Sequence, residues 1–228
     1  MQRTIIVGDV HGCRRELEQL LDRIRFSSGD RLVFVGDLIA RGPDSLGVLD
    51  VARRTGALIV RGNHEQKLLD WHDDEETELG RTHLEVAQAM RDVDWTLLET
   101  SPLWLDLPEH GARVVHAGVL PGVPIEQQDP NTLMRIRTVG KRKTPWGERY
   151  RGAPHVVFGH NALGGLQMHA WATGLDTACV YGGRLSAMVL REGERIPSAI
   201  SRRRALIVQQ TAARAYFDPP KRFRIHAA

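Results

Sequence analysis

Cysteine is scarce in this chain of 228 residues: Cys13 and Cys179 are the two examples, and they lie far apart in the sequence. Such a composition excludes a disulfide-rich secreted scaffold and is typical of a protein from a reducing compartment. Two cysteines alone cannot build a metal site, so a metal centre in this chain would need other side chains.

Long apolar runs are also missing, because charged residues or glycines interrupt every candidate before it reaches the roughly 20 residues that span a bilayer. The N-terminus leads from Met1 directly into a short apolar stretch that ends at Gly8. This stretch lacks the apolar core and the small-residue cleavage pattern of a secretory signal. We therefore expect a soluble, cytoplasmic protein with no membrane partner.

Neither sign of charge is in large excess. The chain has 31 lysines and arginines against 28 aspartates and glutamates, which gives a formal net charge of +3. This surplus permits a polyanionic partner without implying one, and a nucleic-acid partner, which only the basic C-terminal residues indicate, is not expected. Hydrophobic residues at 42% and charged residues at 26% exclude disordered, collagen-like and low-complexity classes.

The first third of the chain alternates between short β-branched runs and amphipathic helical patterns. These patterns predict strands over 4–7, 31–35 and 57–60, and helices over 14–24, 46–52 and 65–71. Successive strand–helix units predict parallel strands joined by crossover helices, which is the α/β class.

The remainder of the chain has a different texture. Residues 73–102 are helical in pattern, and 121–154 are rich in proline and basic residues, which predicts a long loop with one short helix. Short β-type runs predict a second sheet with strands over 103–107, 113–115, 155–158, 166–169, 178–181 and 185–190, and one more strand is predicted over 205–208.

Polar residues follow the predicted strands at their carboxyl ends. The clusters are Gly8–Gly12, Gly36–Asp37, Gly62–Glu65, His116–Gly118 and Gly159–His160. Ligands of α/β sheets bind outside the carboxyl ends of the strands, so these clusters are expected to converge. Aspartate, asparagine and histidine form an oxygen and nitrogen ligand set that suits manganese, iron or zinc and lacks the thiolates of structural zinc sites.

The order of these motifs, Gly-Asp-Val-His-Gly, Gly-Asp-Leu-Ile-Ala-Arg-Gly, Gly-Asn-His-Glu, His-Ala-Gly and Gly-His, resembles the calcineurin-like metallophosphoesterases. More narrowly it resembles the phosphoprotein phosphatase superfamily, as does the Asp-Thr-Ala-Cys-Val-Tyr-Gly-Gly run from Asp176. The resemblance covers about residues 5–190 and implies a four-layer α/β/β/α sandwich. Because the motifs run from Asp9 to His160, we expect a single domain over 1–228, with its core at 4–191 and a basic C-terminal extension at 192–228.

The resemblance implies a site for two divalent metal ions. Its expected ligands are Asp9 and His11 for the first ion, Asp37 as the bridge, and Asn63, His116 and His160 for the second. Manganese is the first expectation, with iron, zinc, cobalt or magnesium as alternatives. Two such ions would lower the pKa of a bridging water and polarise a phosphoryl oxygen.

Four further residues receive roles from the same resemblance. His64 is expected to protonate the leaving oxygen, and Arg41 occupies the position that clamps the phosphate. Arg135 is the candidate for a second catalytic and phosphate-binding arginine, with Arg137 as a close competitor.

Position 40 bears on the substrate. Protein phosphatases of the superfamily orient the catalytic histidine with an aspartate at the place of Ala40. The Ala-Arg-Gly-Pro version at 40–43 instead resembles the bacterial symmetrical diadenosine tetraphosphatases, which release two ADP. A nucleoside diphosphate needs less protonation than an alkoxide when it leaves, so a histidine that no aspartate orients is a sufficient acid.

Two features favour another substrate. The segment between His116 and His160 is short, and Glu65 stands where tetraphosphatases usually have aspartate. The first expectation is therefore symmetrical hydrolysis of diadenosine tetraphosphate and related dinucleoside polyphosphates, and the alternative is a protein serine/threonine or dual-specificity phosphatase. Trp146 and Tyr150 either stack on a base or pack inside, and histidines outside the motifs, such as His83, are expected to be structural or exposed.

Overall fold

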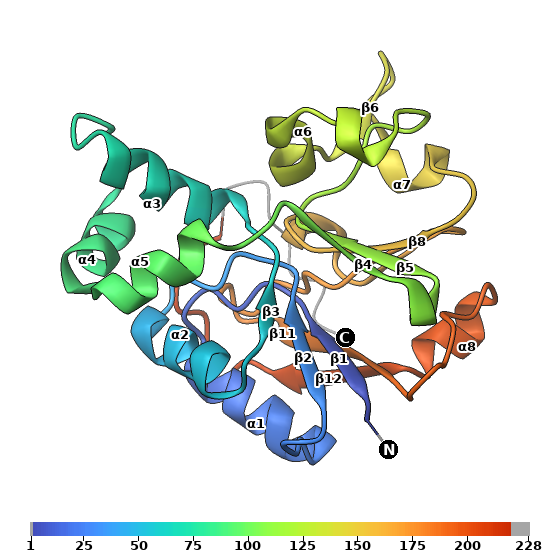
Figure 1. Ribbon diagram of the computed structural model, residues 1–228, viewed down its shortest axis with the longest axis horizontal. Coiled ribbons are helices and arrows are strands. Elements are labelled where there is room, and N and C mark those ends of the chain that lie inside the picture. The colour runs from blue at the N-terminus through green and yellow to red at the C-terminus, as the bar shows by residue number, and fades with distance from the viewer. Residues whose placement is uncertain (1, 220–228) are drawn as a thin grey trace.

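Figure 1 shows a computed structural model of the chain, which describes residues 2–219. Its two main sheets have five strands each, in the orders β12-β11-β1-β2-β3 and β4-β5-β8-β10-β9. The first sheet contains β1 (Thr4–Val7), β2 (Arg31–Phe34), β3 (Leu58–Ile59), β11 (Arg184–Leu190) and β12 (Ile207–Thr211). The second contains β4 (Trp104–Leu107), β5 (Ala112–Val115), β8 (His155–Phe158), β9 (Gln167–Met168) and β10 (Ala172–Gly174).

The first sheet begins as predicted, with β1, β2 and β3 parallel and connected by helices α1 (Arg14–Ile24) and α2 (Ser45–Arg54). The sequence places the strand over 185–190 in the second sheet, and this prediction is wrong. This strand forms β11, which pairs antiparallel with β1, and β12 then pairs antiparallel with β11. A hydrophobic run predicts a strand but does not determine its partner, since pairing is set by tertiary contacts.

The second sheet also differs from the prediction in one strand. Residues 178–181 form a turn that has only isolated bridges at Ala178 and Tyr181, so the strand predicted there is wrong. The strand at this place in the sheet is β10, which runs parallel to β8. Its short Ala-Thr-Gly sequence carries no apolar run, which explains why the sequence did not predict it.

The predicted four-layer α/β/β/α arrangement is confirmed (Figure 1). Ile5, Val7 and Phe34 face α1 and α2 on the outside of the first sheet, while Ile6 and Val33 face the second sheet. This alternation follows from the two-residue period of a strand. On the outside of the second sheet lie α6 (Pro130–Arg135) and α7 (Trp146–Arg149).

Helices α3 (Asn63–Asp73), α4 (Arg81–Ala89) and α5 (Asp92–Glu99) extend beyond the edge strand β3. Helices α4 and α5 pack against α2, and α3 packs against α4 and α5. The proline-rich segment 121–154, predicted as a loop with one short helix, is more ordered than that. It holds α6, α7 and a hairpin of β6 (Thr138–Val139) and β7 (Thr144–Pro145). Residues 2–219 also contain the single-turn helices η1 (Pro108–His110), η2 (Ile125–Gln127) and η3 (Ala162–Gly164).

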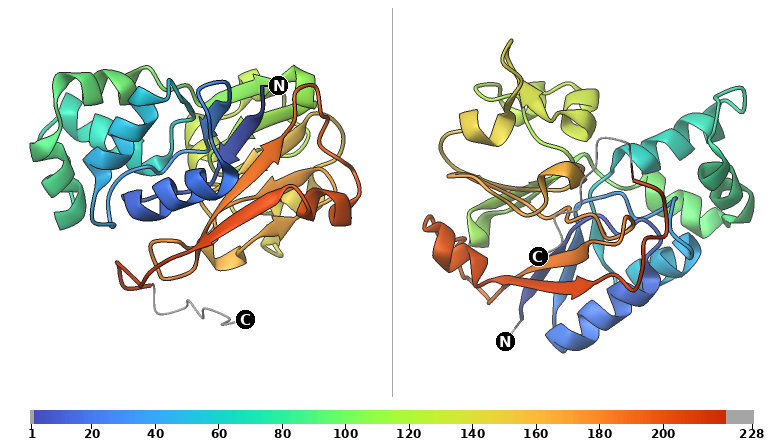
Figure 2. Two further views of the ribbon diagram at one scale, coloured as in Figure 1. Left: turned by 90° about the horizontal axis from the view of Figure 1, so that it is seen from below. Right: turned by 180° about the vertical axis from the view of Figure 1, so that it is seen from behind.

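The first part of the predicted C-terminal extension packs against the rest of the chain. Strand β12 forms the edge of the first sheet, and helix α8 (Ile200–Arg204) lies at the start of that strand (Figure 2). Arg203 is fully buried and donates hydrogen bonds to Thr173 Oγ1 and to the carbonyl oxygen of His169. The basic residues 221–224 lie outside the described residues. No helix within 2–219 is both long and apolar enough to cross a membrane.

Candidate active site

Polar side chains from both sheets converge where parallel strands end. The residues after these strands share one edge, because β1 and β2 run parallel, as do β5 and β8. This edge gathers every predicted metal ligand: Asp9 and His11 after β1, Asp37 after β2, Asn63 at the start of α3, His116 after β5 and His160 after β8. The carboxylate of Asp9 accepts the backbone N–H of His160 at 2.9 and 3.1 Å, which connects the two sheets.

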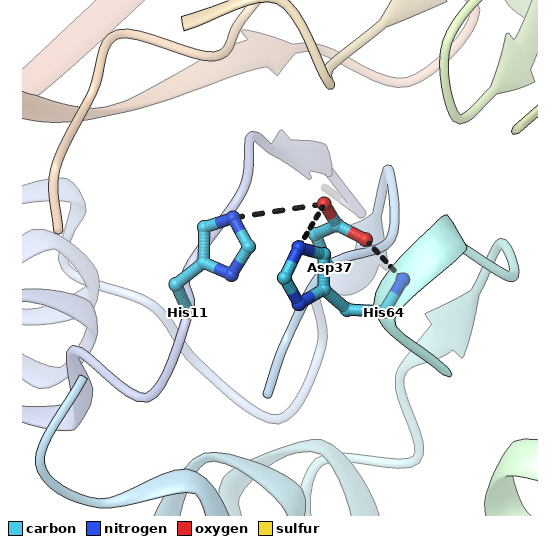
Figure 3. A group of neighbouring side chains, drawn as sticks. All are labelled: His11, Asp37 and His64. Carbon is cyan, nitrogen blue, oxygen red and sulfur yellow. Dashed lines mark hydrogen bonds and ion pairs between the residues drawn. The ribbon is translucent and has the colours of Figure 1, made fainter. Parts of the chain in front are cut away.

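The carboxylate of Asp37 lies at the centre of this group. Its Oδ2 is 3.6 Å from His11 Nε2 and 3.9 Å from His64 Nε2, and Figure 3 shows both rings beside it. These three residues form one cluster whose ligand atoms lie within 4.8 Å of one another. Asp37 belongs to a second such cluster with His116 and His160. Asp37 is therefore the residue that the two clusters share.

The backbone around Asp37 is shaped by close approaches. Asp37 has a φ of +50° and Gly36 a φ of +103°, both in the left-handed region. A Cβ on Gly36 would lie 2.8 Å from the backbone nitrogen of Gly62 and from Nδ1 of His116, so only glycine fits. The carbonyl oxygen of Asp37 accepts the backbone N–H of His11, which fixes that residue beside the carboxylate.

Two oxygen acceptors lie close to one ring nitrogen of His116, so a positively charged group at that nitrogen would be favourable. Its Nδ1 lies 2.9 Å from the carbonyl oxygen of Val35 and donates to it, so Nε2 faces the site. Asn63 Oδ1 lies 3.2 Å and Asp37 Oδ1 3.4 Å from that Nε2. Burial lowers the pKa of His116, but the charges of Asp37 and Asp9 outweigh burial and raise it to about 10. A proton or a metal ion at Nε2 would satisfy all three atoms.

Buried carboxyl groups are concentrated around this point. Burial and the neighbouring Asp176 raise the pKa of Asp9 well above its ordinary value, and burial raises the pKa of Glu65 to about 7. For Asp37 burial acts in the same direction, but the surrounding histidines, His116 first, outweigh it and hold the pKa well below its ordinary value. Divalent cations neutralise such buried charge, so the donor set fits an oxygen and nitrogen metal centre.

Glu65 connects two loops of the site. Its Oε2 accepts the backbone N–H groups of Asp37 and Gly62 at 2.8 and 2.9 Å, and its Oε1 accepts that of Leu38 at 2.8 Å. The carboxylate thereby ties the loop after β2 to the start of α3. The sequence marked Glu65 only as a variant motif position, because this role depends on a tertiary contact.

Asp176 is a buried residue of the site to which the sequence assigned no role. Burial raises its pKa to about 6, with the charge of Asp37 acting in the same direction. Asp176 follows β10, so it fits the pattern of polar residues at the carboxyl ends of strands. A correct prediction of β10 would have marked it as a site residue. The sequence placed a strand at 178–181 instead, and Asp176 then preceded a strand rather than following one.

His64 lies against Asp37 without a carboxylate partner for its Nδ1. Its backbone N–H donates to Asp37 Oδ1 at 3.0 Å, and its ring stacks on that of His83 with centroids 4.7 Å apart. Within residues 2–219, His64 Nδ1 and His83 Nε2 are both buried without a hydrogen-bond partner. Position 40, where the related phosphatases carry aspartate, is a buried alanine.

Three predicted arginines line one cavity beside the metal ligands. The cavity has a volume of about 310 Å³ and is lined by Asp37, Arg41, Asn63, His64, Arg135, Arg137 and His160. Arg135, the predicted second arginine, and Arg137, its close competitor, both line this cavity. Arg137 also lies 3.5 Å from the carbonyl oxygen of His160.

Arg41 is held in place by several contacts. It has a φ of +69°, and its guanidinium lies 5.7 Å from the ring centre of Tyr181 and 6.0 Å from that of Phe217. His11 Nδ1 donates to the carbonyl oxygen of Ile39, so its Nε2 accepts from Arg41 Nη1 at 3.0 Å. Burial, together with the charge of Arg41, lowers the pKa of His11 to about 4, despite the opposing charge of Asp37.

Trp146 is not placed to stack on a nucleotide base. It is 2% exposed, its Nε1 donates to the carbonyl oxygen of Ala117, and its ring packs 4.8 Å from that of Phe158. Tyr150 packs against the ring of Trp146, and its hydroxyl donates a hydrogen bond to the carbonyl oxygen of Pro154. The stacking interpretation of Trp146 is wrong, and the aromatic pair belongs to the core under α7.

Known proteins resemble this chain over most of its length. A family model described as calcineurin-like phosphoesterase matches residues 2–190. An asymmetrical bis(5'-nucleosyl)-tetraphosphatase of Oceanobacillus iheyensis is 30% identical over 223 residues, covering 83% of this chain and 89% of that protein. Serine/threonine-protein phosphatase 1 of Salmonella typhimurium is 33% identical over 195 residues, covering 79% and 88% of the two chains.

A shorter match and a solved structure add to these relatives. The symmetrical bis(5'-nucleosyl)-tetraphosphatase of Shewanella baltica is 41% identical over 131 residues, which cover 53% of this chain and 46% of that protein. A crystal structure described as a candidate diadenosine tetraphosphatase superposes with a TM-score of 0.80 at 37% identity, covering 92% of this chain and 93% of that one.

Proposed function

This chain belongs to the calcineurin-like phosphoesterase family, and we propose that it hydrolyses dinucleoside polyphosphates, with diadenosine tetraphosphate as the first substrate. The observation that carries the proposal is the cavity in which Arg41, Arg135 and Arg137 meet His64 and the metal-ligand candidates. Several arginines around one small cavity match a substrate that carries several adjacent phosphates.

The proposed metal ligands are the set gathered at the strand ends: Asp9, His11, Asp37, Asn63, His116 and His160. Their convergence on Asp37 and the excess of buried carboxyl groups support this assignment. Two divalent cations, manganese first, would supply Lewis acidity and an activated water for attack on phosphorus when bound by these residues. His11 and His116 are oriented for binding because each donates Nδ1–H to a backbone carbonyl.

The remaining residues act on the phosphate chain. Arg41, fixed beside Tyr181 and Phe217, neutralises charge on the oxygens of the phosphoryl group under attack. Arg135 and Arg137, which line the same cavity, bind the neighbouring phosphates. His64 donates a proton to the leaving oxygen.

Cleavage is proposed to be symmetrical, giving two molecules of ADP. The Ala-Arg-Gly-Pro sequence at 40–43 and the local similarity to the Shewanella baltica protein support this choice. Without a carboxylate at position 40 to orient it, His64 is a less effective acid, which suits a nucleoside diphosphate leaving group. The Oceanobacillus iheyensis relative makes asymmetrical cleavage the outcome to test against.

A protein serine/threonine phosphatase is the second candidate function. The Salmonella typhimurium relative covers most of both chains, and Glu65 here ties the two metal loops together as a glutamate rather than an aspartate. An open cavity lined by arginines also admits a phosphoserine side chain.

One experiment separates these functions. Manganese-loaded protein is incubated with diadenosine tetraphosphate and, separately, with a phosphoserine peptide, and products are resolved by anion-exchange chromatography. ADP alone supports the proposal, whereas AMP with ATP contradicts symmetrical cleavage, and turnover of the peptide alone supports the second candidate. Asp37→Asn is the matched control, because it removes the shared carboxylate charge and should abolish either activity.

A further inference from the structure

The two cysteines of the chain meet in the folded protein, in a cluster that contains none of the proposed metal ligands. Sγ of Cys13, Sγ of Cys179 and a carboxylate oxygen of Glu16 lie within 4.8 Å of one another. Cys13 precedes α1, Glu16 lies in its first turn, and Cys179 lies in the turn after β10. Cys13 and Glu16 are 0% exposed and Cys179 is 2% exposed.

Glu16 carries an unsatisfied acceptor at this place. Its Oε1 accepts the backbone N–H of Ala213 at 3.0 Å and the hydroxyl of Tyr216 at 2.8 Å, which fixes the carboxylate. Its Oε2 is buried and has no hydrogen-bond partner among residues 2–219. A buried acceptor without a partner is costly, and a thiol is too weak a donor to offset that cost.

Apolar side chains surround the cluster. Both cysteines belong to the core that α1 forms against the first sheet, together with Leu17 and Val180. These neighbours offer no side-chain donor to the carboxylate. A cation that binds both sulfurs and the carboxylate would satisfy all three groups at once.

We propose that Cys13, Cys179 and Glu16 form a third metal site, which binds one thiophilic divalent cation such as Zn²⁺. Cysteine sulfur and glutamate oxygen are established zinc ligands, whereas magnesium and manganese disfavour sulfur. On binding, the two thiols release their protons to solvent and bind as thiolates. The proposal stands independently of the substrate and of the metals bound at the strand ends.

The site would act as a structural clamp beside the active site. Cys13 is two residues beyond His11, and Cys179 lies between Asp176 and Tyr181, whose ring faces Arg41. A metal ion between the cysteines would hold the loop after β1 against the turn after β10. Both loops carry residues of the candidate active site.

Cobalt provides a direct test, because thiolate binding to Co²⁺ produces a near-ultraviolet sulfur-to-metal charge-transfer band. The proposed ligands at the strand ends supply only oxygen and nitrogen and cannot produce it. The full chain is reduced, freed of metal with a chelator and titrated with Co²⁺. The number of cobalt ions bound per chain is measured by inductively coupled plasma mass spectrometry. The wild-type protein should show the band and bind one cobalt more per chain than Cys179→Ser, which should lack the band.

Asp37→Asn is the reciprocal control: it should keep the band while losing cobalt at the strand ends. Glu16→Gln should weaken cobalt binding at the sulfurs and retain the band at higher cobalt concentration. Failure of a serine variant to fold leaves the test intact, because the wild-type spectrum decides it. A wild-type protein that binds cobalt without the band overturns the proposal, as does a band that persists in both Cys13→Ser and Cys179→Ser.

Discussion

The imidazole of His83, on α4, stacks on the imidazole of His64, with ring centroids 4.7 Å apart and planes 18° apart. His64 is the second residue of α3 and lies beside Asp37, whereas His83, on α4, is not one of the proposed metal ligands. In a site without an aspartate at position 40, this ring contact is what restricts the orientation of the His64 ring on that side.

Replacing His83 should therefore slow the proton transfer assigned to His64. His83→Ala is expected to lower kcat about 10-fold, a fraction of what general acid catalysis contributes, with little change in KM. His83→Phe keeps a stacked ring and should retain most of kcat. Steady-state kinetics checks this, with His72→Ala, which removes a ring stacked on Trp95 instead, as the matched control. Unchanged kcat in His83→Ala would contradict the argument.

Arg41 should contribute mainly to the transition state. Arg41→Ala removes the guanidinium beside His11 and is expected to reduce kcat/KM by about 10²- to 10³-fold, as loss of a charge-stabilising donor does. Arg41→Lys should recover only part of this, because lysine cannot bind a phosphate through two parallel hydrogen bonds. Arg54→Ala, at an exposed position ending α2, is the control for loss of positive charge. Equal losses in the two alanine variants would refute a specific role.

Position 40 should shift the choice of substrate. Ala40→Asp restores the carboxylate found in the related protein phosphatases, and Ala40 has a φ of +64°, which aspartate tolerates better than most residues. The ratio of kcat/KM for a phosphoserine peptide to that for diadenosine tetraphosphate is expected to rise about 10-fold. Ala40→Asn, similar in shape but uncharged, should leave the ratio unchanged. If both variants behave alike, the leaving-group argument fails.

Asp30 should make stability depend on acid pH. Arg3 donates to both its carboxylate oxygens, at 2.9 and 2.6 Å, and these hydrogen bonds hold the Asp30 pKa well below its ordinary value. A carboxyl group whose pKa is lower in the folded than in the unfolded protein stabilises the fold at pH values above the unfolded pKa. This stabilisation is lost as the pH falls toward the folded pKa. Asp30→Asn should cost about 1.5–3 kcal/mol at pH 7.

The difference between wild type and Asp30→Asn should shrink once the pH is below about 4, where the unfolded carboxyl is protonated. Urea unfolding at pH 7 and pH 3 measures it. Asp22→Asn, at an exposed position on α1, should change stability little at either pH. A difference that is constant between the two pH values would show that the ion pair is not its source.

Much of the first sheet was predictable because its information is local. The periods of apolar residues predicted β1, α1, β2 and α2 close to their observed bounds, and the polar residues after each strand predicted where Asp9, Asp37 and His116 would gather. The strand predicted at 178–181 is wrong because the prediction used only local information. Its apolar residues are buried, but as a turn in the core under α1, and burial alone does not distinguish a strand from a packed turn.

The sequence by itself determined the α/β class and the order of the strand-end motifs, because strand period and glycine-permitted turns are properties of neighbouring residues. The residues proposed to bind metal follow from the family resemblance that these motifs carry. Only the tertiary structure decided that β11 joins the first sheet, that Asp176 enters the site and that His83 stacks on His64. It likewise decided that Cys13 and Cys179 meet beside the carboxylate of Glu16. Each of these contacts joins segments distant in the chain, and such pairings depend on how whole layers pack rather than on any local pattern.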